Sequence, residues 1–224
     1  MKIMDIGEIR AGDVLLCYKD AKFDLVGKGI TSVTGSDYTH AAICTSSSAA
    51  AEARVSGGVS KIEIKDLVKR YDHVAVFRQP DAWRSSDRIQ AMNAFIDSIV
   101  ASGAKYSLRD VATFKKRNEI HQLSLTDQLY AFFNGTYSPA PVEKGSYFCS
   151  ELVASCFVVT GFIDPSAAVV YKSNVTSPGA LGRDPTFGTF CGYVSAIPNY
   201  SAPNTDEFFN HSTFDEIFGD DTQS

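Results

Sequence analysis

The stretch that decides the fold is Gly145-Ser-Tyr-Phe-Cys149-Ser-Glu-Leu-Val-Ala-Ser-Cys156-Phe157. It places one cysteine where a loop rich in proline, glycine and serine gives way to an apolar helix, expected over 149–160. The first turn of a helix carries unpaired N–H groups and a partial positive charge, and both favour a thiolate over a thiol. Cys149 is therefore the candidate nucleophile of this chain.

A thiolate catalyst also needs a base, and His40 lies in Tyr38-Thr-His40-Ala-Ala-Ile-Cys44, a segment typical of a buried strand. The other histidines compete less well. His73 begins a strand without an acid at strand spacing, His121 falls in a polar helical stretch and His211 in an acidic tail. The alternative is that His40 is an ordinary core histidine whose hydrogen bonds are satisfied within the protein.

Glu52 is the candidate partner of this base. A turn at 46–48 predicts a hairpin in which Ala42 lies opposite Glu52, so that His40 and Glu52 share a face as diagonal neighbours. Such neighbours are about 7–8 Å apart at Cα, within reach of long side chains. Glu52 then binds one imidazole nitrogen and leaves the other for the thiol. The alternative is a solvent-facing strand glutamate, and a slip of one residue would separate the pair.

The remaining pattern predicts one α+β domain over 1–200, followed by an acidic extension over 201–224. Strands are expected at 13–18, 38–45, 49–55, 59–64, 73–78 and 187–197, and helices at 22–33, 66–71, 84–101, 109–116, 123–133 and 149–160. The extension holds six acidic residues and no Lys or Arg, but it also contains four phenylalanines. A disordered tail would have fewer aromatic residues, so we expect it to dock on the body; a partner-binding segment is the alternative.

The composition argues against several classes of protein. The net charge is −5 with scattered Lys and Arg, so no nucleic-acid partner is expected. No apolar run approaches 18 residues, so no transmembrane segment is expected. The start of the chain is too polar for a signal peptide, which predicts synthesis in the cytoplasm and leaves open export by a route without a cleaved signal.

The cysteines do not form a metal-binding or disulfide pattern. There are five, an odd number, with no Cys-x-x-Cys pair, so we expect neither a disulfide framework nor a zinc site, and no cofactor. Cys17, Cys44, Cys156 and Cys191 lie in apolar runs and are expected in the core.

Taken in order, the motifs resemble the circularly permuted NlpC-type papain-like cysteine hydrolases, the YiiX/YaeF-like group. The resemblance covers about residues 11–197 and departs from the family in Thr39, where Ser is usual, and in the long segment 107–146. The matching motifs are Gly12-Asp13-Val-Leu-Leu, Thr34-Gly-Ser36-Asp-Tyr-Thr-His40, Ala51-Glu52-Ala53, Gly58-Val59, Val74-Ala-Val-Phe-Arg78, Gly103-Ala-Lys-Tyr106, Tyr147-Phe-Cys149-Ser-Glu-Leu152 and Ser177-Pro178.

The resemblance implies a permuted papain-like fold, in which an antiparallel sheet packs against helices. It also implies that Cys149 is the nucleophile, His40 the base and Glu52 the residue that orients the imidazole. Tyr106 and Ser150 are further candidates, for the substrate pocket or the oxyanion site. For Ser150 the alternative is an ordinary position in the first turn of the helix.

The implied function is that of a cysteine hydrolase working through an acyl-enzyme on the bacterial envelope. Relatives of this type cleave peptide amides of the cell wall, which predicts an amidase or endopeptidase. Other permuted relatives act on lipid acyl esters, which leaves a phospholipase as the alternative. Tyr130-Ala-Phe-Phe133 is expected in the core, with an acyl groove as the other possibility.

Two further expectations concern partners. A small hydrolase without a signal peptide suits a toxin effector that a secretion machine delivers, with an immunity protein as its partner. The rival from a different class is a non-catalytic binding module on the same scaffold, with the acidic, phenylalanine-containing tail as its contact.

Overall fold

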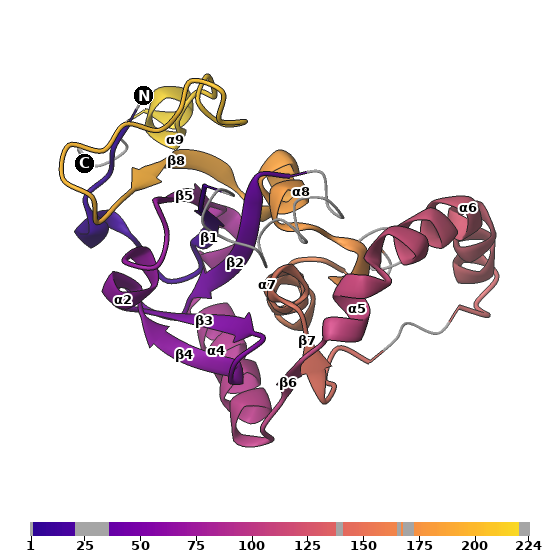
Figure 1. The fold of residues 1–224 in the computed structure, drawn as a ribbon. Coiled ribbons are helices and arrows are strands. Elements are labelled where there is room, and N and C mark those ends of the chain that lie inside the picture. Colours follow the sequence, from indigo (N-terminus) through magenta and orange to yellow (C-terminus); the bar gives the residue numbers. More distant parts are fainter. Residues whose placement is uncertain (1, 21–35, 138–140, 165–166, 168–172, 220–224) are drawn as a thin grey trace.

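The structure, a computed structural model, describes residues 2–20, 36–137, 141–164, 167 and 173–219. Its centre is a sheet with the strand order β4-β3-β2-β1-β5-β8, in which all neighbouring strands are antiparallel (Figure 1). The strands are β1 (Val14–Tyr18), β2 (Tyr38–Cys44), β3 (Ala49–Arg54), β4 (Gly58–Glu63), β5 (His73–Arg78) and β8 (Thr189–Val194). This confirms an α+β fold with an antiparallel sheet packed against helices. The helix expected over 22–33 lies outside the described residues.

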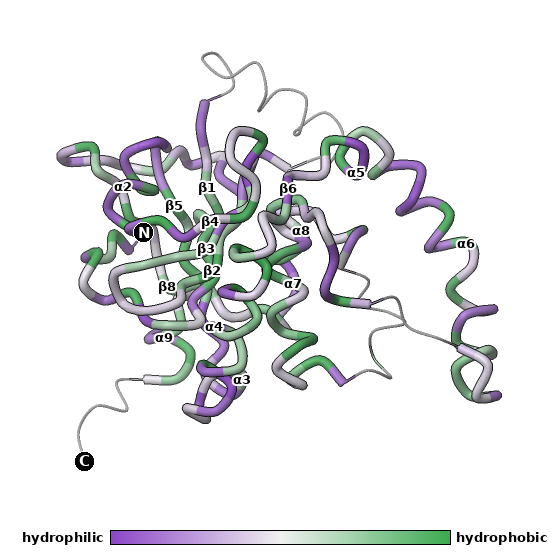
Figure 2. The backbone as a smooth tube through the Cα atoms, turned by 90° about the horizontal axis from the view of Figure 1, so that it is seen from below, coloured by the Kyte–Doolittle hydropathy of each residue, from purple (hydrophilic) through white to green (hydrophobic). Residues whose placement is uncertain are grey.

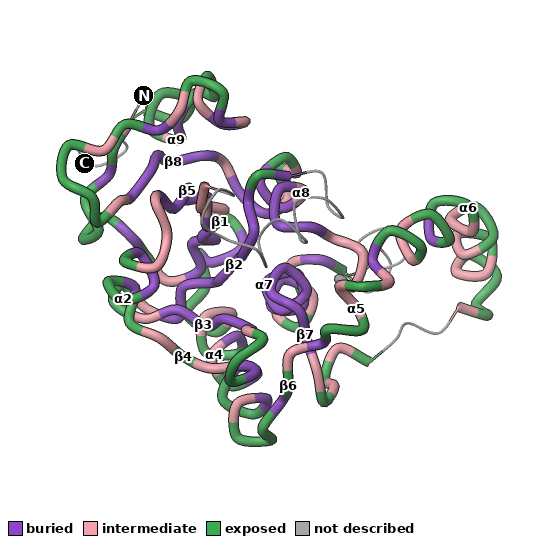
Figure 3. Tube along the Cα trace, viewed as in Figure 1, coloured by how far each residue is buried: buried purple, intermediate pink, exposed green. Residues whose placement is uncertain are grey.

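The central strands are apolar because both faces of the sheet are covered there. Successive side chains of a strand point to opposite faces. In β1, Val14 and Leu16 join the core that includes α7 (Cys149–Val159), whereas Leu15 and Cys17 join the core that includes α2 (Ile64–Val68). All seven residues of β2 are buried. Figure 3 shows this burial concentrated in the middle strands and α7.

Helices α7 and α8 (Pro178–Arg183) cover the first of these faces, and a further helix packs on α7. Helix α7 packs against β2 and β3 and against α4 (Ser86–Ala101), while α8 lies on β2 and β1. The first nine residues of α7 are buried, so this short helix runs through the core and owes its stability to packing. The remaining short elements are η1 (Ile6–Glu8), α3 (Pro80–Trp83), η3 (Ser173–Val175) and η4 (Pro185–Phe187).

The segment between α4 and α7 differs from the prediction. Two separate helices were expected at 109–116 and 123–133, but the structure has α5 (Leu108–Ala112) and then one continuous helix, α6 (Phe114–Phe133). No glycine or proline lies between the two predicted pieces, so nothing in the backbone interrupts the helix. In Figure 1, α6 extends away from the sheet.

The expectation that Tyr130 to Phe133 belong to the core was wrong. Tyr130 is 67% exposed and Phe133 is 79% exposed, because the end of α6 lies beyond the elements that cover the sheet. Figure 2 shows the same contrast: hydrophobic colour concentrates in the central strands and α7, whereas α6 alternates between hydrophilic and hydrophobic residues. No helix in the described part of the chain is both long enough and apolar enough to span a membrane.

Several boundaries also moved. The helix expected at 66–71 covers Ile64–Val68. The last strand, predicted at 187–197, begins only at Thr189 because η4 precedes it, and it ends at Val194. A pair of short parallel strands, β6 (Lys105–Tyr106) and β7 (Ser146–Tyr147), was not predicted. This pair places Tyr106 beside Tyr147, two residues before Cys149.

The described part of the tail docks on the body, as expected. Asp206 accepts hydrogen bonds from the hydroxyls of Tyr38 and Tyr193, at 2.9 and 2.5 Å, and Phe208 is fully buried. Helix α9 (Phe214–Phe218), which follows, packs on β8. Phe208 therefore serves the core and is not displayed for a partner.

Candidate active site

Cys149 is the first residue of α7 and is only 3% exposed. The start of the helix is held by Glu151, whose carboxylate accepts a hydrogen bond of 3.2 Å from the backbone N–H of Phe148 and pairs with Lys144. Burial raises the pKa of Glu151, and the Lys144 ammonium and this N–H group oppose that rise. Glu151 thus holds the first turn of α7 in place, and with it the backbone that carries the Cys149 thiol.

The hairpin of β2 and β3 has the predicted register. Ala42 lies opposite Glu52, and the turn closes through hydrogen bonds from the backbone N–H groups of Thr45 and Ser46 to the carbonyl of Ala49. His40 and Glu52 consequently share a face, and the distance from His40 Nε2 to Glu52 Oε2 is 2.9 Å. Both residues are buried, at 7% and 1% exposure.

The thiol, the imidazole and the carboxylate form one electrostatic unit. Burial alone lowers the pKa of His40, but hydrogen bonds and charge interactions with Cys149 and Glu52 raise it to about 9. Because Glu52 occupies Nε2, the nitrogen that remains for the sulfur is Nδ1. The raised pKa favours the imidazolium form of His40, which places a positive charge beside the Cys149 sulfur.

Two residues that sequence reasoning missed complete this unit. Arg70 Nη1 donates a hydrogen bond of 2.7 Å to Glu52 Oε1, on the oxygen that His40 does not use. Burial raises the pKa of Glu52, but His40 and Arg70 outweigh it and hold that pKa below its usual value. The ring of Tyr71 stacks on His40, with centroids 5.8 Å apart. Both residues follow α2, and no local pattern links that segment to the hairpin.

Tyr106 and Ser150 have different surroundings near Cys149. Burial raises the pKa of Tyr106, and the nearby Cys149 adds to that rise. Ser150 is fully buried, and its hydroxyl donates a hydrogen bond of 2.7 Å to the carbonyl of Thr176. That bond gives Ser150 a structural role, while its backbone N–H remains in the first turn of α7.

The other histidines have different surroundings. His73 is fully buried and contacts Asp206 through Nε2, at 3.2 Å, and the Tyr200 hydroxyl through Nδ1, at 2.7 Å. Its acid comes from the tail, which is why strand spacing did not reveal it. His121 is buried on α6, although its neighbours in the sequence are polar, and His211 is exposed.

The remaining cysteines occupy the core, as predicted. All four are buried and free, and burial raises the pKa of each thiol: Cys17, Cys44, Cys156 and Cys191. They are therefore poor nucleophiles at neutral pH. Within the described ranges, no three His, Cys, Asp or Glu side chains come together as a set of metal ligands.

Comparisons with protein-family models, with curated proteins and with solved structures find no match to this chain. The resemblance to permuted NlpC-type hydrolases therefore stands on the motifs of the chain alone.

Proposed function

We propose that this protein is a cysteine hydrolase that works through an acyl-enzyme, with a circularly permuted papain-like fold. The observation that carries the proposal is the buried contact between His40 and Glu52, 2.9 Å long, beside a cysteine at a helix N-terminus. A buried carboxylate and imidazole are costly unless they are paired, and their pairing next to a thiol supports the proposal of a catalytic unit.

The proposed reaction has two halves. The Cys149 thiolate attacks the substrate carbonyl, and the oxyanion is stabilised by backbone N–H groups in the first turn of α7. The His40 imidazolium then gives its proton to the leaving amine, so that the carbon–nitrogen bond breaks and a thioester remains. In the second half His40 takes a proton from water, the resulting hydroxide attacks the thioester, and the carbon–sulfur bond breaks to release a carboxylic acid and restore the Cys149 thiolate beside the His40 imidazolium. Glu52 and Arg70 keep the imidazole oriented throughout.

We favour a cell-wall peptide as the substrate, which makes the protein an amidase or endopeptidase of the bacterial envelope. One observation supports the alternative, a lipid acyl ester. Leu123, Tyr130 and Phe133 of α6 are 85%, 67% and 79% exposed, and exposed apolar side chains on a projecting helix suit a lipid surface. The same thiolate serves both reactions, so the two functions differ in the bond that is cleaved.

The test compares bacterial envelopes incubated with the wild type, with Cys149→Ala or with Cys191→Ala, a matched loss of a buried thiol outside the site. Mass spectrometry should find new cell-wall peptide fragments with the wild type and Cys191→Ala only. New lysophospholipids and fatty acids in the same two samples would support the lipase instead. Equal products with Cys149→Ala would disprove the mechanism.

A simpler measurement addresses the rival proposal of a binding module on the same scaffold. The thiol of Cys149 should react with iodoacetamide much faster than the four core thiols, and His40→Ala should slow that reaction. Uniformly slow alkylation would favour the binding module. Delivery as a toxin effector, with an immunity protein, is a further proposal: expression of the wild type in the periplasm of a target cell should be toxic, and Cys149→Ala should not.

A further inference from the structure

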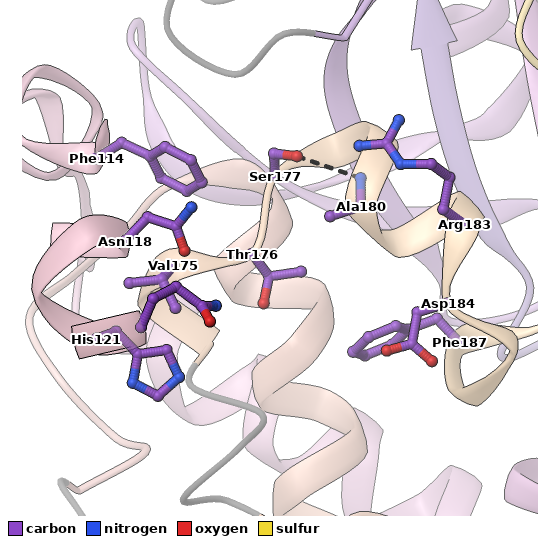
Figure 4. Close-up of a pocket in the computed structure, with 11 residues that line it drawn as sticks. Phe114, Asn118, His121, Val175, Thr176, Ser177, Ala180, Arg183, Asp184 and Phe187 are labelled. Atoms are coloured by element: carbon purple, nitrogen blue, oxygen red, sulfur yellow. Dashed lines mark hydrogen bonds between the residues drawn. The ribbon is translucent and has the colours of Figure 1, made fainter. Parts of the chain in front are cut away.

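A cavity of about 380 Å³ lies between α6 and the segment that runs from η3 through α8 to η4 (Figure 4). Phe114 and Asn118 line it from α6, and Thr176, Ser177, Asp184 and Phe187 line it from the opposite side. This size is within the range of small-molecule sites, which is about 300–1,000 Å³. The wall from α6 belongs to the segment 107–146, where this chain departs from the family that it resembles.

The cavity adjoins the candidate nucleophile through both neighbours of Cys149 in the sequence. The ring of Phe148 meets the ring of Phe114 edge to face, with centroids 6.0 Å apart. On the other side, Ser150 donates its hydrogen bond to the carbonyl of Thr176. Two walls of the cavity are therefore in direct contact with the residues on either side of Cys149.

The walls combine aromatic rings with polar side chains that can still form hydrogen bonds. In Figure 4, Asn118 points from α6 toward the segment that carries Thr176 and Ser177. Within the described part of the chain, no hydrogen bond engages the Asn118 side chain. Asp184 Oδ1 accepts a bond of 2.9 Å from the backbone N–H of Thr186, and no described group binds its second oxygen.

Of the charged side chains that line the cavity, Asp184 is the one without an ion-pair partner among the described residues. Arg183, which also lines it, forms an ion pair of 2.5 Å with Glu207 of the tail. His121 lines it as well, but it is buried and already engaged within the protein. No cation in the described residues forms an ion pair with Asp184. A carboxylate at the rim of a partly apolar cavity attracts an ammonium group and disfavours an acyl chain.

We propose that this cavity binds the amine-bearing part of a peptide substrate, with Asp184 accepting from the ammonium group and Asn118 hydrogen-bonding an adjacent amide. The inference rests on the proposed function and names its substrate class: an amino-containing peptide, and not a lipid ester. Asp184 is then a specificity-determining residue. A hydrogen bond to a charged group contributes about 1.5–3 kcal/mol, which corresponds to a roughly 10-fold to 150-fold preference for the free amine.

The experiment measures binding to the full chain carrying Cys149→Ala, so that no hydrolysis is required. The probes are a cell-wall tripeptide that ends in lysine, with its amines free, and the same tripeptide with both amines acetylated. Calorimetry should show that the free peptide binds at least about tenfold more tightly. Adding Asp184→Asn, which keeps the acceptor for Thr186, should abolish that preference, whereas Asp66→Asn, an equal charge change on α2, should preserve it.

Equal affinity for the two peptides, binding of neither, or a preference that survives Asp184→Asn would each overturn the inference. A thermal melt of each variant by circular dichroism checks that the fold is retained. The outcome is separable from the fate of the proposed function. Amine-selective binding by a chain whose wild type cleaves nothing would support the cavity and reject the hydrolase. Cleavage without amine preference would do the reverse.

Discussion

His73 and Asp206 lie 133 positions apart in the chain, yet their side chains meet at 3.2 Å with no exposed surface on either. The Asp206 carboxylate also accepts from Tyr38, Tyr193 and the backbone N–H of Phe208. The tail is thereby tied to two central strands of the sheet and to its edge strand β8. Strand β2 carries both Tyr38, which binds the tail, and His40. The docking of the tail and the geometry of the candidate site therefore depend on the same strand.

Asp206→Asn should therefore destabilise the protein. The change leaves buried hydroxyls and an imidazole with a poorer partner, and breaking a buried charged network costs about 3–5 kcal/mol. Urea denaturation at neutral pH measures the loss. Asp215→Asn is the matched control, because its ion pair with Lys2 is on the surface and such pairs contribute less than about 1 kcal/mol. Equal losses in the two variants would contradict the role of the buried network.

The effect of Asp206 should depend on pH. Burial raises its pKa, but hydrogen bonds from His73, Tyr193 and Phe208 outweigh burial and lower it below the ordinary value of 3.8. A lowered folded-state pKa gives stability that is present above 3.8 and is lost as the pH falls through the folded value. The difference in unfolding free energy between wild type and Asp206→Asn should shrink as the pH falls from 5 toward about 2. A constant difference would count against this assignment.

Glu52→Gln should lower the pKa of His40 from about 9, because it removes the negative charge that favours the imidazolium. An NMR titration of the His40 ring checks this directly. Carboxylates that orient metal-bound histidines are typically worth about 10–100-fold, and by analogy alkylation of Cys149 should slow by about that factor at neutral pH. Glu63→Gln, an exposed strand carboxylate paired with Lys65, is the control. An unchanged His40 titration would refute the pairing.

The same pair predicts a pH dependence of stability. The raised pKa of His40 contributes stability that is fully present below the ordinary value of 6.5 and is lost as the pH rises through about 9. The unfolding free energy of the wild type should therefore decline over this range relative to that of His40→Gln. Parallel curves for the two proteins between pH 6 and 10 would show that the histidine is not charged in the fold.

Arg70→Ala should weaken the site less than Glu52→Gln does. The guanidinium holds only one carboxylate oxygen, and its side chain is 35% exposed, so water replaces part of the interaction. We expect a drop of several-fold in the alkylation rate of Cys149. Lys69→Ala removes a neighbouring cation whose partner is Asp66 and should have no effect. A larger loss for Arg70→Ala than for Glu52→Gln would contradict a role of the arginine that acts through Glu52.

Ser150→Ala and Tyr106→Phe separate structural from chemical roles. Ser150→Ala should cost about 1 kcal/mol of stability through the lost bond to Thr176 and leave the alkylation rate of Cys149 unchanged. Tyr106→Phe should slow hydrolysis about tenfold or more without slowing alkylation, because alkylation forms no oxyanion. A strong effect of Ser150→Ala on hydrolysis alone would restore its hydroxyl to the oxyanion site.

The sequence alone determined the features that depend only on residues close together in the chain, namely the start of α7 and the register of β2 and β3. The helix at Cys149 begins where the loop composition changes, and the β2–β3 register follows from a turn of three serines, so the contact between His40 and Glu52 was predictable. Both depend on backbone geometry within about a dozen residues. The alternation of apolar residues likewise located most strands of the sheet.

Only the tertiary structure decided which distant surfaces meet. Arg70 reaches Glu52 and Asp206 reaches His73 because the sheet brings those segments together, and no periodicity encodes such an encounter. Periodicity also could not show that Phe133 is exposed, because burial depends on whether another element covers the helix. The contact between His40 and Glu52 arises from local geometry, whereas the contact with Arg70, the cavity beside α6 and the docked tail arise from long-range packing.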